Sequence, residues 1–145
     1  MGSAIRSFAS FVFLTPHPCY AKIRIMGSDE WAVVFYADAS GDEPVRSLIR
    51  SLSLKTQARF DWSIEQLRVR NVYARPPLAR HLEGKLWELR EESQTNIYRL
   101  IYAFLSGRRI VFLHGFQKKT QKTPQREIEI AERRLTDFLA REGGE

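Results

Sequence analysis

Four side chains that can bind phosphate or move protons fall on stretches with the composition of β-strands. Arg90 lies in the first stretch, residues 86–91, and Arg99 lies in the second, residues 96–105. His114 and Lys118 lie in a third stretch that begins at residue 108. A guanidinium group binds phosphate bidentately, and a His, or a Lys whose pKa is lowered by neighbouring cations, can transfer protons. These four residues are the candidate catalytic residues of the chain.

The third stretch joins an apolar run to a cationic loop. Residues 110–116 are apolar on both faces and too few to span a membrane, which predicts a buried central strand. From Arg108 to Arg126 the chain has six Lys or Arg and no Asp or Glu. A basic loop beside exposed aromatic rings is typical of a polyanion site, because rings stack on unpaired bases. The residues expected to contact RNA are Lys119, Lys122, Phe116 and Arg108.

These side chains suit cleavage of an RNA strand by its own 2′-hydroxyl. Such a site must hold the 2′-oxygen in line with the phosphate, remove its proton, stabilise the charged phosphorane and protonate the 5′-oxygen. No cluster of Asp and Glu stands near this stretch, so a two-metal nuclease is not indicated. The chain has no phosphate loop, dinucleotide fingerprint or nucleophile elbow, and no cofactor or metal is predicted.

Each candidate also has a structural interpretation. Arg90 and Arg99 can form ion pairs with Glu88, Glu91 or acids on a helix. His114 in an apolar strand can be a hydrogen-bonded core residue, and loop lysines can serve solubility alone. Convergence of these side chains on one face is what favours a functional site.

The alternation of side chains along a strand tests this convergence. We expect Trp87 and Leu89 on one face of the first stretch, and Glu88 and Arg90 on the other. In the second, the aromatic-rich side packs on helices and Arg99 points the opposite way. In the third stretch we expect one face to carry Phe112, His114, Phe116 and Lys118. The opposite face would carry Val111, Leu113 and Gly115.

The elements that position these residues follow from periodicity and turn residues. Residues 31–36 form a first strand, and two short apolar repeats after Pro44 and from near Leu54 predict consecutive helices. A connection with Arg75, Arg80 and His81 leads to three antiparallel strands, over residues 86–91, 96–105 and from 108 onward. Thr123 is the expected N-cap of a last helix. The predicted fold class is α+β, in the order β-α-α-β-β-β-α with the antiparallel meander packed on helices.

Length and composition limit the possibilities. The 145 residues are enough for one domain with a core, and the net charge of +6 favours an acidic partner such as nucleic acid. The single cysteine, Cys19, rules out an internal disulfide and fits a reducing cytoplasm.

The first 25 residues differ from the rest of the chain. A cation, an apolar run and Ala21 resemble a short secretory signal, but prolines stand near the cleavage position. An extra structural element is a further alternative. We favour an N-terminal extension over residues 1–25, disordered or not native, followed by one domain over residues 26–145.

Several motifs together resemble a known toxin family. They are residues 78–80, 86–90 and 98–102 and, above all, the run from Val111 to Pro124. The chain is similar here to the phage-derived Gp49-like branch of the HigB toxins, within the RelE/ParE superfamily. This resemblance covers about residues 30–141 and implies a compact RelE-like fold. The family's motif positions fall on Glu88, Arg90, Arg99, His114, Lys118 and Lys119.

The resemblance implies a toxin of a type II toxin–antitoxin pair. Such a toxin is an endoribonuclease, an mRNA interferase that cuts translated mRNA on the ribosome in the cytoplasm without a metal. Its partner is a helix-turn-helix antitoxin, and no membrane is involved. Arg99 would stabilise the transition state, Lys118 and Lys119 would bind phosphates, and His114 and Arg90 are support or acid–base candidates. A ParE-like DNA gyrase poison, and a nucleic-acid-binding module or inactive remnant, remain alternatives.

Overall fold

The computed structural model describes residues 30–142, which form an α+β domain with three helices and a five-stranded mixed sheet. The predicted extension, residues 1–25, lies outside the described residues. The elements in chain order are β1 (Ala32–Phe35), α2 (Pro44–Arg50), α3 (Leu54–Arg70), the 3-10 turn η2 (Asn71–Tyr73), β2 (Ala79–Glu83), β3 (Leu86–Ser93), β4 (Asn96–Leu105), β5 (Arg109–Lys118) and α4 (Gln125–Arg141).

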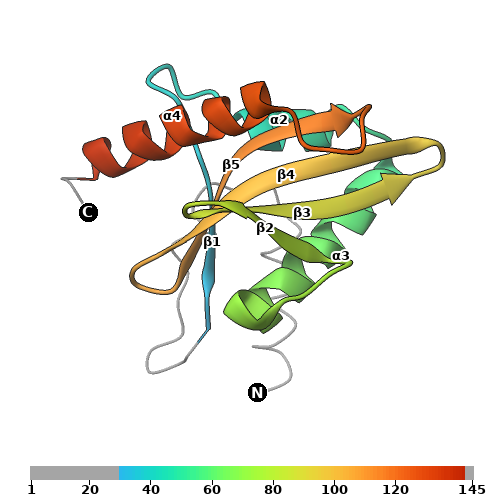
Figure 1. Cartoon of the computed structure of the whole chain (residues 1–145), viewed down its shortest axis with the longest axis horizontal. Helices are drawn as coiled ribbons and strands as arrows, with labels where there is room; N and C mark the ends of the chain where they lie inside the picture. The colour runs from blue at the N-terminus through green and yellow to red at the C-terminus, as the bar shows by residue number, and fades with distance from the viewer. Residues whose placement is uncertain (1–29, 143–145) are drawn as a thin grey trace.

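The sheet has the strand order β1-β5-β4-β3-β2, in which β1 pairs parallel with β5 and the other neighbours are antiparallel. Helices α2 and α3 pack on one face through a core that includes Val45, Phe60 and Tyr102. Helix α4 covers the other face through Ile128 and its neighbours. Figure 1 shows α3 and α4 on opposite sides of the strands. None of the helices in the described range is long and apolar enough to cross a membrane.

The two helices after Pro44 are confirmed, and local chemistry explains their separation. Ser53 follows the first apolar repeat and is the N-cap of α3. Its hydroxyl accepts a hydrogen bond from the Thr56 backbone N–H at 3.2 Å. Along α3, Phe60, Ile64 and Leu67 face the sheet. The apolar spacing indicated two adjacent stripes on this helix, and the structure buries the one with Phe60, Ile64 and Leu67 while Trp62 and Val69 are exposed.

Residues 79–83 form a strand, whereas the sequence predicted a connection. β2 is the first strand of a four-stranded meander and lies at the edge of the sheet. Arg80, His81 and Glu83 are exposed, so the strand has no apolar alternation that would reveal it. It returns into β3 through Gly84, whose φ of +53° suits a tight turn.

A β-bulge changes the predicted faces of β5. Ile101 pairs with His114 but the next residue, Tyr102, pairs with Phe112, so Leu113 is an extra residue in β5. Phe112 accordingly packs with α2 and α3, while Leu113 lies on the α4 face together with His114. The prediction that Phe112 shares the His114 face, with Val111 and Leu113 opposite, is wrong.

Gly115 follows the bulge and lies next to Leu48 of α2. A methyl group at this position would lie 2.7 Å from Leu48 Cδ2 and 2.9 Å from Leu100 Cδ2, so a larger residue would require both leucine side chains to shift. His114, Phe116 and Lys118 are left on the α4 face, beside the Arg99 side of β4.

Helix α4 begins one residue later than predicted. Pro124 occupies the N-cap position and makes no side-chain cap. Thr123 is not the cap; its side chain is buried and directed to the sheet. This contact ties the loop before α4 to β3.

Candidate active site

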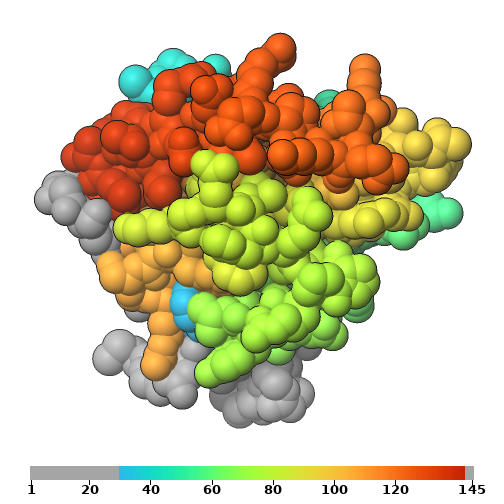
Figure 2. Space-filling model, viewed as in Figure 1, coloured from blue at the N-terminus to red at the C-terminus, as the bar shows by residue number. Residues whose placement is uncertain are grey.

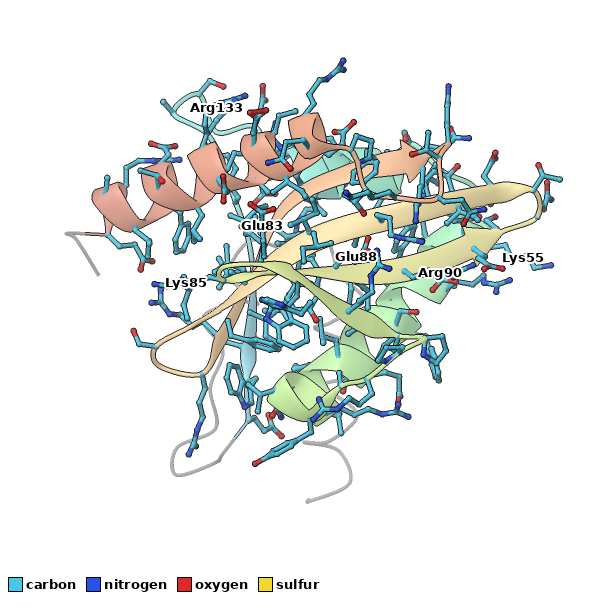
Figure 3. The ribbon with its side chains drawn as sticks, in the orientation of Figure 1. Lys55, Glu83, Lys85, Glu88, Arg90 and Arg133 are labelled. Atoms are coloured by element: carbon cyan, nitrogen blue, oxygen red, sulfur yellow. The ribbon has the colours of Figure 1, made fainter. Side chains whose placement is uncertain are left out.

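The centre of the candidate site is the Glu88 carboxylate, whose side chain is only 3% exposed. Strand β3 places it on the α4 face, directly opposite Arg80 of β2 and diagonal to Arg99 of β4. Glu88 Oε2 accepts from Arg80 Nη2 at 2.6 Å and Nε at 3.1 Å. A buried carboxylate needs such charged donors, because an unpaired charge away from water is costly. Figure 3 shows Glu88 beside Arg90 on β3.

Arg99 is the second partner of Glu88 and the most buried cation of the site. Its Nε lies 2.9 Å from Glu88 Oε1, and its side chain is 6% exposed. The buried Nη1 atom has no hydrogen-bond partner within residues 30–142. Burial lowers the pKa of the Arg99 guanidinium, and the charges of Arg90 and Arg80 lower it further. An anion bound here would gain a donor that is otherwise unsatisfied.

Thr123 supplies the third contact to Glu88. Its hydroxyl donates to Glu88 Oε1 at 3.1 Å across 35 residues of chain. The cationic loop that ends at Thr123 is thereby fixed beside the two arginines. Lys119 and Lys122 are exposed on this loop.

Lys118, at the end of β5, lies close enough to Glu88 and the three arginines for their charges to affect its pKa. Burial lowers the pKa of its ammonium group, and the charge of Arg99 is the next largest effect. Arg80 and Arg90 lower that pKa as well, against the opposing charge of Glu88. We refer to Arg80, Arg90, Arg99 and Lys118 as the cationic cluster. A lysine in such surroundings releases its proton more readily than an ordinary lysine does.

A pocket of about 430 Å³ opens at this cluster. Arg80, Glu88, Arg90 and Arg99 form one part of its lining, and the segment Pro76–Ala79 forms the rest. Arg90 is 42% exposed and pairs with Glu92. The pocket therefore offers guanidinium groups at a concave surface, an arrangement suited to a phosphate group.

His114 is held by α4 and not by the pocket. Its Nε2 lies 2.6 Å from Glu127 Oε1, and Arg134 Nη1 lies 3.0 Å from its Nδ1. Because arginine only donates, Nδ1 accepts and Nε2 carries the proton that is donated to Glu127. Burial lowers the pKa of His114, and the charge of Arg134 lowers it as well. Phe116 stacks on the imidazole with ring centroids 5.6 Å apart.

The structure thus brings together three of the four predicted catalytic residues: Arg90, Arg99 and Lys118 share one electrostatic environment. His114 and Phe116 lie on the same sheet face but against α4. Arg108 lies in the turn between β4 and β5, at the other end of β5 from Lys118, so it does not join the cluster.

The sequence did not predict that Arg80 and Thr123 contribute to this site. The turn at Gly84 could have revealed the β2–β3 hairpin, but residue 80 lies opposite residue 88 only because the register shifts between His81 and Glu83, which the sequence does not indicate. Nothing in the sequence indicates the Thr123 contact. Within the described range, no three His, Cys, Asp or Glu side chains are grouped so that they could hold a metal ion.

A comparison with protein families finds one matching model, described as phage-derived protein Gp49-like (DUF891), over residues 47–136. The matched range runs from α2 into α4 and contains the whole cationic cluster together with Glu88 and Thr123. A search of the curated proteins finds no match.

Proposed function

The chain belongs to the phage-derived Gp49-like family, and we propose that it is the toxin of a type II toxin–antitoxin pair and acts as an mRNA interferase. Proteins of this family are commonly toxins of such pairs. The proposed substrate is mRNA under translation on the ribosome, in the cytoplasm. The proposed partner is a helix-turn-helix antitoxin that holds the toxin inactive.

The observation that supports cleavage most strongly is the buried Arg99 guanidinium. One of its nitrogens is bound by Glu88, another has no partner in the described chain, and the group lines a pocket beside Arg80 and Arg90. Preorganised donors of this kind stabilise the extra negative charge of a phosphorane without reorganisation during the reaction. Ordinary surface arginines lack both the burial and the fixed partner.

In the proposed reaction the RNA supplies its own nucleophile. Lys118, in its neutral form, removes the proton of the 2′-hydroxyl, and the 2′-oxygen attacks the adjacent phosphorus. Arg99 stabilises the resulting phosphorane with Arg80 and Arg90. The bond to the 5′-oxygen then breaks, and that oxygen takes a proton from solvent. The products are a 2′,3′-cyclic phosphate and a 5′-hydroxyl, and no metal takes part.

Glu88 and His114 serve as positioning residues in this proposal. Glu88 holds Arg80 and Arg99 at fixed angles and limits their mutual repulsion. His114 is neutral and has both ring nitrogens engaged by α4, so it supports β5 next to Lys118. Lys119 and Lys122 contact RNA phosphates from the loop, and Phe116 contacts the RNA at the α4 side.

Controlled expression in a bacterial host tests the proposal. Primer extension on cellular mRNA should reveal cuts within translated frames for the wild type and for Arg109→Ala, and none for Arg99→Ala. Arg109 is a matched control, because it is an arginine with a side chain only 16% exposed that forms an ion pair, with Glu142 at 2.6 Å, but lies at the far end of β5. Co-expression of the neighbouring helix-turn-helix protein should restore growth.

The same experiment distinguishes the ParE-like alternative. Growth arrest with intact mRNA and broken DNA would identify a gyrase poison and overturn the nuclease proposal. Equal cutting by Arg99→Ala and the wild type would remove Arg99 from the reaction.

A further inference from the structure

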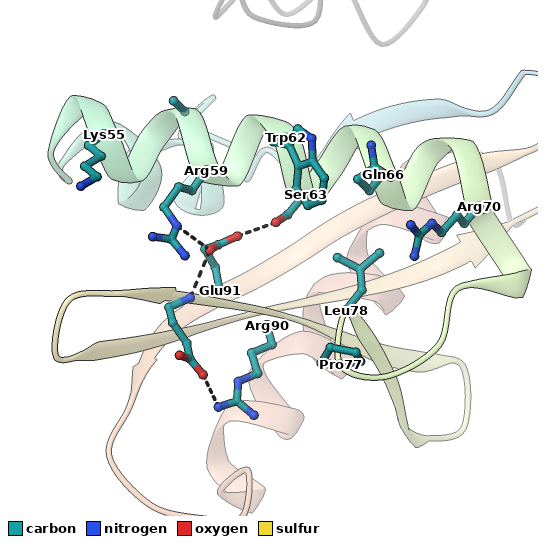
Figure 4. A pocket seen from close by; sticks show the side chains of 12 residues that line it. Lys55, Arg59, Trp62, Ser63, Gln66, Arg70, Pro77, Leu78, Arg90 and Glu91 are labelled. Atoms are coloured by element: carbon teal, nitrogen blue, oxygen red, sulfur yellow. Dashed lines mark hydrogen bonds and ion pairs between the residues drawn. The ribbon is translucent and has the colours of Figure 1, made fainter.

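A second pocket, of about 650 Å³, runs between α3 and β3. We call it the α3 groove. Figure 4 shows α3 as one wall, and β3 with the Pro77–Leu78 segment as the other. The proposed cleavage step uses none of the α3 side chains in this groove.

The groove is lined by more cations than carboxylates, since Lys55, Arg59, Arg70 and Arg90 outnumber Glu91 and Glu92. Lys55 stands near one end of α3 and Arg70 at the other, with Arg59 between them. Arg59 is paired with Glu91 at 3.1 Å. Lys55 and Arg70 form no ion pair with any residue in the range 30–142. Two cations without a carboxylate partner, separated along the helix by about 22 Å at 1.5 Å per residue, match the repeated charges of an extended polyanion.

An exposed aromatic ring stands between these cations. Trp62 lines the groove and is 62% exposed, although an indole normally packs away from water. Single-stranded nucleic acid is bound by this combination, since bases stack on rings while cations follow the backbone.

The α3 groove adjoins the pocket at the cationic cluster. Pro77, Leu78 and Arg90 line both. In Figure 2 the yellow-green surface of the β2–β3 segment lies between the orange-red loop before α4 and the green surface of α3. A strand with one phosphate at Arg99 can therefore pass Arg90 and enter the groove.

We propose that the α3 groove binds the single-stranded RNA that flanks the cleaved bond, with one base stacked on Trp62 and phosphates at Lys55 and Arg70. This inference rests on the proposed nuclease function and adds a binding subsite to it. A protein partner fits less well, because none of the exposed aliphatic side chains of this region, Leu54, Val69 and Val72, lines the groove.

Binding to a non-cleavable RNA tests the subsite. The probe is a fluorescent single-stranded RNA with a 2′-O-methyl group at every nucleotide, measured by anisotropy with the full chain. Trp62→Ala should weaken binding about tenfold, and Trp62→Phe should retain most of it. The matched control is Leu54→Ala, which removes an apolar side chain that is 82% exposed on the same helix but outside the groove, and should bind like the wild type. The double variant of Lys55→Ala and Arg70→Ala should lower the dependence of log Kd on log salt.

The outcomes separate the subsite from the nuclease proposal. If Trp62→Ala binds RNA as tightly as the wild type while Arg99-dependent cleavage persists, the subsite is overturned and the nuclease remains. If RNA binding depends on Trp62 but no RNA is cut, the nuclease proposal fails alone. Loss of antitoxin binding in Trp62→Ala, with RNA binding unchanged, would assign the groove to a protein partner instead.

Discussion

The Glu88 carboxylate and the Arg99 guanidinium form a buried ion pair, with Glu88 Oε1 2.9 Å from Arg99 Nε and both side chains at most 6% exposed. The pair fixes a cation on the one sheet face where three further cations gather. Burial of this kind makes each partner dependent on the other.

The first prediction concerns the stability of this pair. Glu88→Gln should lower the free energy of unfolding by about 3 kcal/mol, because Arg99 then remains buried without its counter-charge. Glu92→Gln removes the exposed carboxylate that pairs with Arg90 and should cost less than about 1 kcal/mol. Urea unfolding measures both. Equal losses in the two variants would show that the Glu88 pair is not the buried unit described here.

The second prediction concerns pH. If neutral Lys118 takes the 2′ proton, the cleavage rate should rise with pH and level off at the pKa of Lys118, which burial and Arg99 place below the ordinary 10.5. Lys118→Arg keeps the charge but cannot lose its proton, so the rate should fall at least about a hundredfold. Single-turnover cleavage rates measured over a range of pH test this rise. A wild-type profile that falls with rising pH would make Lys118 an acid.

His114 yields the third prediction. The amide of His114→Gln can still accept from Arg134 and donate to Glu127, so activity should stay within a few-fold and the pH profile should not move. His114→Leu removes the donor to Glu127, whereas Arg134 keeps its bond to the Leu113 carbonyl at 2.9 Å, and the variant should cost about 1–3 kcal/mol of stability. If the rise of the cleavage rate with pH is lost in His114→Gln, His114 itself takes part in the proton transfer.

The sequence predicted those parts of the fold that depend on uninterrupted periodicity. Alternation along β4 correctly separated Arg99 from Tyr98 and Leu100, and helical spacing after Pro44 correctly indicated two consecutive helices. The face of Phe112 could not be predicted, because the bulge at Leu113 depends on how β5 pairs with β4. Arg80 and Thr123 reach Glu88 through an edge strand and an irregular loop, which leave no periodic pattern.

A fourth prediction concerns a site away from the cluster. Burial raises the pKa of Asp61 from 3.8 to about 6, against the opposing charge of Arg46. A carboxyl group with a raised pKa binds its proton more tightly when folded, so its contribution is full below pH 3.8 and is lost as pH rises to about 6. Asp61→Asn should therefore stabilise the protein by about 1–2 kcal/mol at pH 8 and by less at pH 5.

Urea titrations at the two pH values measure this difference. The exposed Asp42→Asn substitution is the control and should change stability little at either pH. A gain for Asp61→Asn that is the same at pH 5 and pH 8 would contradict the raised pKa.

The most direct test of the central claim is the chemistry of the RNA ends. The purified protein is added to an in vitro translation reaction, and the ends of the mRNA fragments are determined. We expect a 2′,3′-cyclic phosphate or its opened phosphate on one side and a 5′-hydroxyl on the other, produced by the wild type and Arg109→Ala but not by Arg99→Ala. Fragments with a 3′-hydroxyl and a 5′-phosphate, or undiminished cutting by Arg99→Ala, would contradict attack by the 2′-hydroxyl at this cluster.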